Sequence, residues 1–188
     1  MKKKRIEFYI AILAIIVAFF ALLVSLWQLE ITREHNRLSV RPKILITPYL
    51  EGPGGRNGLY IENSGLGPGT IDSFIVDTPH GTYAGFGTNY WKEILESHNL
   101  EAFCFSKGWP DPEATLKAGE KIALLEVKKS KPDGCYFEAL KTFQQKNIVL
   151  SINFHSMYDE SFSTKRNFNI GSKELEVINS VIGQYIVK

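Results

Sequence analysis

The chain has almost none of the residue patterns that accompany enzyme chemistry. Its two cysteines, Cys104 and Cys135, do not form a C-x-x-C pair, and no serine lies in a G-x-S-x-G motif. None of its four histidines has a second histidine at the spacing of a zinc ligand pair. These absences predict a protein that is not an enzyme and that has no metal or cofactor site.

A basic surface is missing as well. From Arg41 onward the chain has 16 Lys and Arg against 17 Asp and Glu, so the small positive net charge belongs to the N-terminal residues. Nucleic-acid-binding domains concentrate Lys and Arg on one face, because phosphate contacts dominate their affinity. We therefore expect no nucleic acid partner.

One long stretch lacks charge altogether. Residues Phe8 to Leu29 read FYIAILAIIVAFFALLVSLWQL. As a helix they extend about 33 Å, enough to cross a hydrocarbon core of about 30 Å. Tyr9 and Trp27 lie near the two ends, where amphipathic rings favour the headgroup level. The stretch predicts a transmembrane helix with Phe8 and Leu29 as its ends and the lipid bilayer as its partner.

The exit of this stretch favours a permanent anchor over a cleaved signal peptide. A signal peptide has an apolar core of about 7–15 residues, followed by small residues at the cleavage site. Here the apolar run is longer, and near its C-terminal end it reads Ser25-Leu26-Trp27, with bulky side chains where a cleavage site needs small ones.

Positive charges flank both ends of the apolar stretch, so orientation depends on their density. Lys2 to Arg5 precede it, and a similar number of basic residues follow it by Lys43. The N-terminal group is contiguous, and moving it across an energised membrane opposes the potential at about 2.3 kcal/mol per charge per 100 mV. An orientation with the N-terminus inside and the C-terminus outside is therefore favoured.

The residues after Leu29 predict a short helical stalk. The segment EITREHNRLSV has neither Gly nor Pro, and its charged residues lie three and four apart, as on a helix surface. Pro42 disfavours helical geometry at Arg41 and ends the helix. Together these features predict an anchor and stalk over residues 1–38 and one domain of ordinary size over residues 39–188.

The domain reads as short strands separated by turns rich in glycine and proline. Strands are expected at 43–50, 59–62, 70–77, 82–86, 147–157 and 162–170, and one more within 116–127, after a turn at Gly119. Helices are expected at 89–100, 135–146 and 172–184. Thr88 is the expected N-cap of the first, and Trp91, Ile94 and Leu95 form its apolar stripe. Residues 101–114 are expected to be irregular. The pattern predicts an antiparallel β-sandwich with inserted helices, and a small closed barrel is the alternative.

The segment NSGLGPG (Asn63–Gly69) predicts a structural turn. Gly65 and Gly67 suit a backbone with positive φ, and Pro68 fixes the exit. A phosphate-binding loop is the alternative, but no helix follows to supply its dipole, and Pro68 lacks a backbone N–H. Asn63, Gly65, Gly67 and Pro68 are therefore interpreted as parts of the fold.

His155, Asp159 and Glu160 lie close enough in sequence to be drawn as a metal or acid–base group. In this strand Leu150, Ile152 and Phe154 are expected to share the buried face with Ile148. His155 is out of phase with them, so it should face outward. The two acids lie in the turn that follows the strand. We interpret all three as ordinary surface residues.

Cys104 and Cys135 leave two outcomes open. They can form a disulfide if the domain lies outside the cytoplasm, or remain free thiols if it lies inside. The outcome depends on their distance in the fold, which a sequence does not contain.

Four segments together resemble a broad group of bacterial membrane proteins. They are HNRLSVRP (His35–Pro42), NSGLGPG (Asn63–Gly69), LKAGEKIALL (Leu116–Leu125) and YDESF (Tyr158–Phe162). The group consists mostly of uncharacterised small proteins with one N-terminal membrane helix and an immunoglobulin-like domain, in which an N-x-G-x-G-P-A motif precedes a strand. Gly69 stands here where alanine is commoner. The resemblance implies an immunoglobulin-like sandwich anchored by a single pass in the bacterial inner membrane, and it implies no reaction.

Two kinds of function fit these features. One is a membrane-anchored, non-enzymatic interaction or sensor module, whose sheet faces and loops bind another protein or a small ligand. The other is a membrane-acting effector of a bacterial stress or phage-defence (abortive infection) system. Small residues three or four apart let helices approach closely, so self-association through the span is also expected. These residues are Ala11, Ala14, Ala18 and Ala21.

Overall fold

The chain divides into two units, which are described separately. The computed structural model describes residues 2–52, 55–85, 87, 89–128, 132–143 and 147–168. Contacts within the chain separate Met1–Val40 from Arg41–Lys188. The division falls just beyond residue 38, where the anchor and stalk are expected to end.

The first unit is a single helix, α1 (Lys2–Ser39), which contains the whole apolar stretch. Its residues from Ile6 to Ser39 are long and apolar enough to cross a membrane, and none of its most apolar window is buried. Lipid offers no hydrogen bonds, so a polar group inside a bilayer must be satisfied within the helix. The Ser25 hydroxyl meets this requirement by donating to the Ala21 carbonyl oxygen at 2.9 Å. The prediction of an N-terminal helix able to span a membrane is confirmed.

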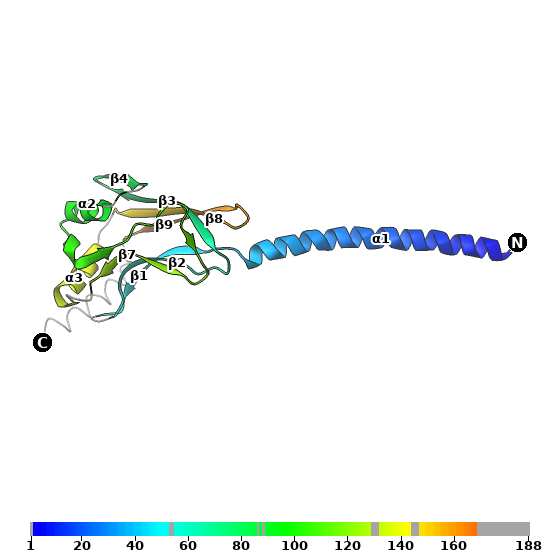
Figure 1. Ribbon diagram of the computed structural model, residues 1–188, viewed down its shortest axis with the longest axis horizontal. Coiled ribbons are helices and arrows are strands. Elements are labelled where there is room, and N and C mark those ends of the chain that lie inside the picture. Colours follow the sequence, from blue (N-terminus) through cyan, green and yellow to red (C-terminus); the bar gives the residue numbers. More distant parts are fainter. Residues whose placement is uncertain are drawn as a thin grey trace. The chain divides into compact units, whose positions relative to one another are not determined.

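The second unit contains two antiparallel sheets that lie face to face (Figure 1). One has the spatial order β1 (Ile44–Leu50), β2 (Asn57–Asn63), β7 (Lys121–Val127), β5 (Phe105–Lys107). The other has the order β4 (Gly81–Ala84), β3 (Gly69–Thr78), β8 (Val149–Ser156), β9 (Ser161–Asn167), and β6 (Thr115–Leu116) pairs with the start of β3. The predicted class, an apolar helix followed by a two-sheet antiparallel region, is confirmed at this level.

The core lies between the sheets because apolar side chains alternate along the strands. In β8, Leu150, Ile152 and Phe154 are at most 3% exposed, whereas Asn153 faces solvent. The three buried side chains join Ile61 of β2 in one hydrophobic cluster. Burying each such side chain contributes about 1.5–3 kcal/mol, which makes this alternation the main stabilising term of the domain.

Edge strands of the two sheets are joined by hydrogen bonds from side chains, not by the backbone hydrogen bonds of paired strands. β1 and β9 are edge strands of different sheets. The Thr164 hydroxyl of β9 donates to the carbonyl oxygen of Ile44 at 2.7 Å, and Arg166 Nη1 donates to that of Ile46 at 3.1 Å. Among the described strands the arrangement is therefore a pair of sheets, not the closed barrel that was the alternative.

Helix α2 (Tyr90–Ser97) packs on the core by one face. Trp91, Ile94 and Leu95 are its buried residues, and their spacing of three and four is the apolar stripe expected from the sequence. Thr88, the expected N-cap, lies outside the described residues. Asn89 precedes the helix, and its side chain makes no capping hydrogen bond.

The expectation that residues 101–114 are irregular is wrong in part. This segment contains a short 3₁₀ turn, η1 (Ala102–Cys104), and strand β5, in which Phe105 aligns with Val127 of β7. Three residues are too few to show a recognisable alternation. Helix α3 (Pro132–Phe143) begins earlier than expected. The helix expected at 172–184 lies outside the described residues.

Candidate binding site

The residues singled out from the sequence do not gather at one site. Phe8 and Leu29, the expected ends of the span, lie within α1 with side chains 63% and 48% exposed. The Asn63–Gly69 turn and the two cysteines belong to the second unit, where they serve different parts of the fold.

Asn63 holds the turn between β2 and β3 through a buried side-chain amide. Its Oδ1 accepts hydrogen bonds from the backbone N–H groups of Lys43 at 3.1 Å and Gly65 at 3.0 Å. Its Nδ2 donates to the carbonyl oxygens of Gly67 at 2.8 Å and Leu116 at 3.0 Å. Because Asn63 is 0% exposed, these bonds replace all that water would provide. The turn thereby connects the approach to β1 with β6.

The reason for glycine in this turn differs from the one expected. The expectation of a positive φ at Gly65 or Gly67 is wrong, because neither residue has one. Among the described glycines, positive φ occurs at Gly52, Gly81, Gly85 and Gly119. Gly65 instead lies against the backbone before β1, where an added Cβ would stand 2.5 Å from the Arg41 carbonyl oxygen and closer still to the Lys43 nitrogen. Close approach of two backbone segments explains the glycine at position 65, and Pro68 leads into β3.

Replacing Gly65 with alanine should destabilise the domain. The Cβ of Gly65→Ala has no room, so the two backbone segments must separate, at a cost of about 1–3 kcal/mol in the free energy of unfolding. Urea unfolding of the detergent-solubilised full chain, followed by tryptophan fluorescence, measures this change. Leu66→Ala is the matched control in the same turn, because Leu66 is 77% exposed, and it should change stability by less than about 0.5 kcal/mol. Equal midpoints for Gly65→Ala and the parent would refute the packing explanation.

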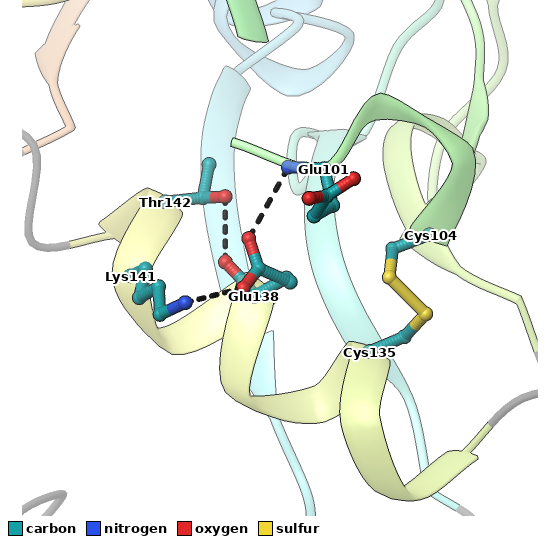
Figure 2. Close-up of a disulfide and its surroundings, with 6 residues drawn as sticks. All are labelled: Glu101, Cys104, Cys135, Glu138, Lys141 and Thr142. Carbon is teal, nitrogen blue, oxygen red and sulfur yellow. Dashed lines mark hydrogen bonds and ion pairs between the residues drawn. A yellow bond between two sulfur atoms is a disulfide. The ribbon is translucent and has the colours of Figure 1, made fainter. Parts of the chain in front are cut away.

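Cys104 and Cys135 form a disulfide between η1 and α3 (Figure 2). Their Cα atoms are 5.1 Å apart, and 31 positions separate them in sequence. Both residues are at most 3% exposed, so the bond is part of the packed interior. Of the two outcomes left open by the sequence, the structure contains the bridge.

A buried carboxylate reinforces this junction. Glu138 of α3 is 7% exposed and accepts hydrogen bonds from the backbone N–H of Glu101 at 3.2 Å and from the Lys141 ammonium. The Thr142 hydroxyl donates to the Glu138 carbonyl oxygen at 2.8 Å, as Figure 2 shows. The hydrogen bond to this carboxylate raises the pKa of Lys141. The disulfide and the carboxylate together fix α3 to the segment before β5.

Removing the disulfide should weaken the fold more than any single surface change. In the chain-entropy account, a closed loop of this length stabilises by about 3–4 kcal/mol. The double variant Cys104→Ala, Cys135→Ala should therefore unfold at a lower urea concentration, as should the parent after reduction. Reductant should leave the double variant unchanged, which makes it the control. A parent whose midpoint is insensitive to reduction would contradict the prediction.

His155 pairs with a residue that the sequence did not indicate. Its Nδ1 lies 2.6 Å from Asp72 Oδ1 of β3, whereas Asp159 is in the turn after β8 with φ of 59°. The pairing follows from the β3–β8 register, which shifts beside Asp72. Within the described residues, no group of three or more His, Cys, Asp or Glu side chains is placed to hold a metal ion.

A cavity of about 640 Å³ opens between the start of α2 and the loop after β5. Small-molecule sites commonly measure about 300–1,000 Å³. Its aromatic wall consists of Tyr90 and Trp91 from α2 and Trp109 from the loop. The Trp109 ring lies at 69° to Tyr90, with centroids 5.1 Å apart, and at 63° to Trp91, with centroids 5.6 Å apart. Three rings in the lining of the cavity therefore meet at steep angles.

The aromatic wall is supported from behind. Trp91 is 3% exposed, and its indole N–H donates to the Gly108 carbonyl oxygen at 2.7 Å, which ties the loop to the helix. Phe74 of β3 packs edge-on against Trp109, with centroids 4.7 Å apart. Tyr90 lies over the backbone of Gly87, where any side chain would overlap its ring. These contacts hold the rings in place before any ligand arrives.

The other side chains of the lining, apart from its two glycines, are polar. Asn89, Glu93, Lys107 and Asp111 line the cavity, and all four are exposed. Across the part of the chain that the structure describes, their side chains make no hydrogen bond or ion pair with protein groups. Both signs of charge are present, and their donors and acceptors are free to meet a ligand.

Two other polar clusters of the domain already have partners within the fold. On β1, β2 and β7, the Lys121 ammonium donates to the Tyr49 hydroxyl, which donates to Glu62, each at 2.7 Å. The Tyr49 hydrogen bond lowers the pKa of Glu62 and raises that of Lys121. Near the start of β1, in a hollow of about 500 Å³, the Arg41 guanidinium lies 4.6 Å from the centroid of the Phe162 ring. The cavity beside α2 differs from both clusters because its polar side chains are not used by the fold.

Sequence reasoning missed this site. Trp91 was recognised only as part of an apolar stripe, and Trp109 was placed in a segment expected to be irregular. The two tryptophans meet because β5 pairs with β7 and returns the chain to α2. The available signal was the sequence GWPDP (108–112), in which a large aromatic residue stands among turn residues beside an acid.

Comparisons with protein-family models, with curated proteins and with solved structures find no match to this chain. Its function is therefore inferred from its own residues.

Proposed function

We propose that this protein is a single-pass, membrane-anchored binding module without enzymatic activity. The observation that carries the proposal is the exposed apolar surface of α1. Phe8 and Trp27, for example, are 63% and 70% exposed. Soluble monomers rarely expose apolar patches beyond a few hundred Å², whereas a bilayer would cover this whole stretch. The second unit then carries the binding function, at the cavity beside α2.

An immunoglobulin-like arrangement of the second unit is part of the proposal. The order β1-β2-β7-β5 corresponds to strands A-B-E-D of an immunoglobulin domain, and β4-β3-β8-β9 corresponds to C′-C-F-G. The correspondence supports the resemblance noted in the sequence. One departure is the disulfide, which joins η1 to α3 instead of joining strands B and F.

We place the second unit outside the cytoplasm of a bacterial cell, with the N-terminus inside. Disulfides persist in oxidising compartments and are rare in the reducing cytosol. The Cys104–Cys135 bridge therefore supports this side, and it agrees with the contiguous positive charge of Lys2 to Arg5.

The cavity supports binding better than catalysis. General acid–base catalysis needs a side chain held in position near the reacting atoms. Glu93 and Asp111 are exposed, and no hydrogen bond among the described residues orients either carboxylate. A ligand, in contrast, can order exposed side chains as it binds.

The full chain expressed in bacteria should remain in the membrane pellet after alkaline carbonate washing, because a spanning helix is retained where a peripheral protein is stripped. Its second unit should be cut by protease added to spheroplasts. Its thiols should react with maleimide only after denaturation and reduction, and a Cys104→Ser, Cys135→Ser variant is the blank.

Three outcomes would contradict parts of this proposal. Release by carbonate would refute the anchor. If the second unit is protected from the protease and its thiols are free, it lies inside the cytoplasm. Overexpression that arrests growth with dye uptake, and that loses this effect without residues 1–30, would favour the membrane-acting effector.

A further inference from the structure

We propose that the cavity beside α2 binds a neutral saccharide. This inference rests on the proposed function, since it names the ligand of the same binding module. It is carried by two features together, the aromatic wall and the unpaired polar side chains that line the same cavity.

The aromatic wall suits the apolar face of a sugar ring. Tyr90 and Trp109 are half-buried, so each ring is anchored on one side and keeps surface open to the cavity. A pyranose ring presents C–H groups on its faces and hydroxyls at its rim, and aromatic rings offer large, rigid apolar surface for such faces. Trp91 is almost fully buried and acts as support rather than as a contact.

The polar side chains suit the rim of hydroxyls. A hydroxyl both donates and accepts, and the lining provides both partners. Asn89 offers an amide with donors and an acceptor, Lys107 offers donors, and the carboxylates accept. Because these groups are exposed and unpaired, water is all that a ligand has to displace.

The charges argue against an anionic ligand. Glu93 and Asp111 outnumber Lys107 in the lining, so an anion would meet net repulsion. A neutral ligand with many hydroxyls is opposed by none of the three. The volume of about 640 Å³ lies within the range of small-ligand sites and admits a short saccharide.

The test uses the full chain carrying Trp27→Phe, so that Trp91 and Trp109, two of its three tryptophans, report from the cavity. The protein is purified in a polyoxyethylene detergent, because sugar-headed detergents would compete. It is screened on a glycan array with neutral and charged glycans, and each positive glycan is titrated by tryptophan fluorescence. We expect saturable binding of at least one neutral glycan, with little dependence on salt.

Variants locate the binding. Trp109→Ala should weaken binding roughly tenfold or more, because it removes the stacking surface. Asn89→Ala and Asp111→Ala should also weaken it, and neither side chain has a partner among the described residues, so the fold should be kept. Glu96→Ala is the matched control, since Glu96 lies on α2 but does not line the cavity, and its variant should bind like the parent.

Each other result overturns a different statement. Absence of neutral glycan binding, binding unchanged in both Asn89→Ala and Asp111→Ala, or binding only of charged glycans with strong salt dependence would refute the saccharide inference, while the membrane assays still decide the proposed function. Cleavage of a bound glycan, seen by mass spectrometry, would keep the saccharide and refute the absence of enzymatic activity. Release of the chain by carbonate would refute the anchor without changing the glycan result.

Discussion

The domain depends on how the chain passes from one sheet to the other, and the buried amide of Asn63 fixes that passage. A buried polar group left without a partner costs about 1–3 kcal/mol, so an amide with both of its polar atoms bonded admits few alternative arrangements. The four bonds of Asn63 reach the backbone before β1, the turn itself and β6. Gly65 allows the turn to touch the backbone of Arg41 and Lys43 directly. The buried side chain of Asn63 and the lack of a side chain at Gly65 therefore together fix how the two sheets meet at this corner.

A second set of constraints acts where α2, η1 and α3 meet. The Cys104–Cys135 disulfide and the buried Glu138 hold α3 to the segment before β5, while the Trp91 indole holds the loop after β5 to α2. β5 is only three residues long and would be a weak element alone. Its pairing with β7 is secured by covalent and polar links on both sides. A rigid frame of this kind allows the exposed side chains around the cavity to stay unpaired without loss of the fold.

The features predicted well from the sequence are those with a strong local signal. The uncharged run from Phe8 to Leu29 indicated the long helix, and alternation in β8 indicated which of its side chains are buried. The motif around Asn63 was recognised as a turn, but its glycine was explained by backbone conformation, since close approach between Gly65 and Arg41 depends on contacts distant in sequence. The cavity was not predicted for the same reason, because it also depends on contacts between residues distant in sequence. Trp91 and Trp109 carry no shared pattern, and only the pairing of β5 with β7 brings them together.

The anchor and the cavity, as proposed, complement each other energetically. A ligand that stacks on two half-buried rings and replaces water at exposed side chains gains modest free energy, because a typical hydrogen bond contributes only about 0.5–1.5 kcal/mol net. Ordering flexible side chains such as that of Lys107 costs about 0.5–1.5 kcal/mol more. A single site of this kind is weak in solution. When several copies on one membrane bind a ligand with repeated units, every binding event after the first is effectively intramolecular. The overall affinity can then rise by about 10²–10⁴ without new contacts. If the span holds several copies on one surface, as the proposal implies, it would raise the overall affinity without requiring a deeper pocket.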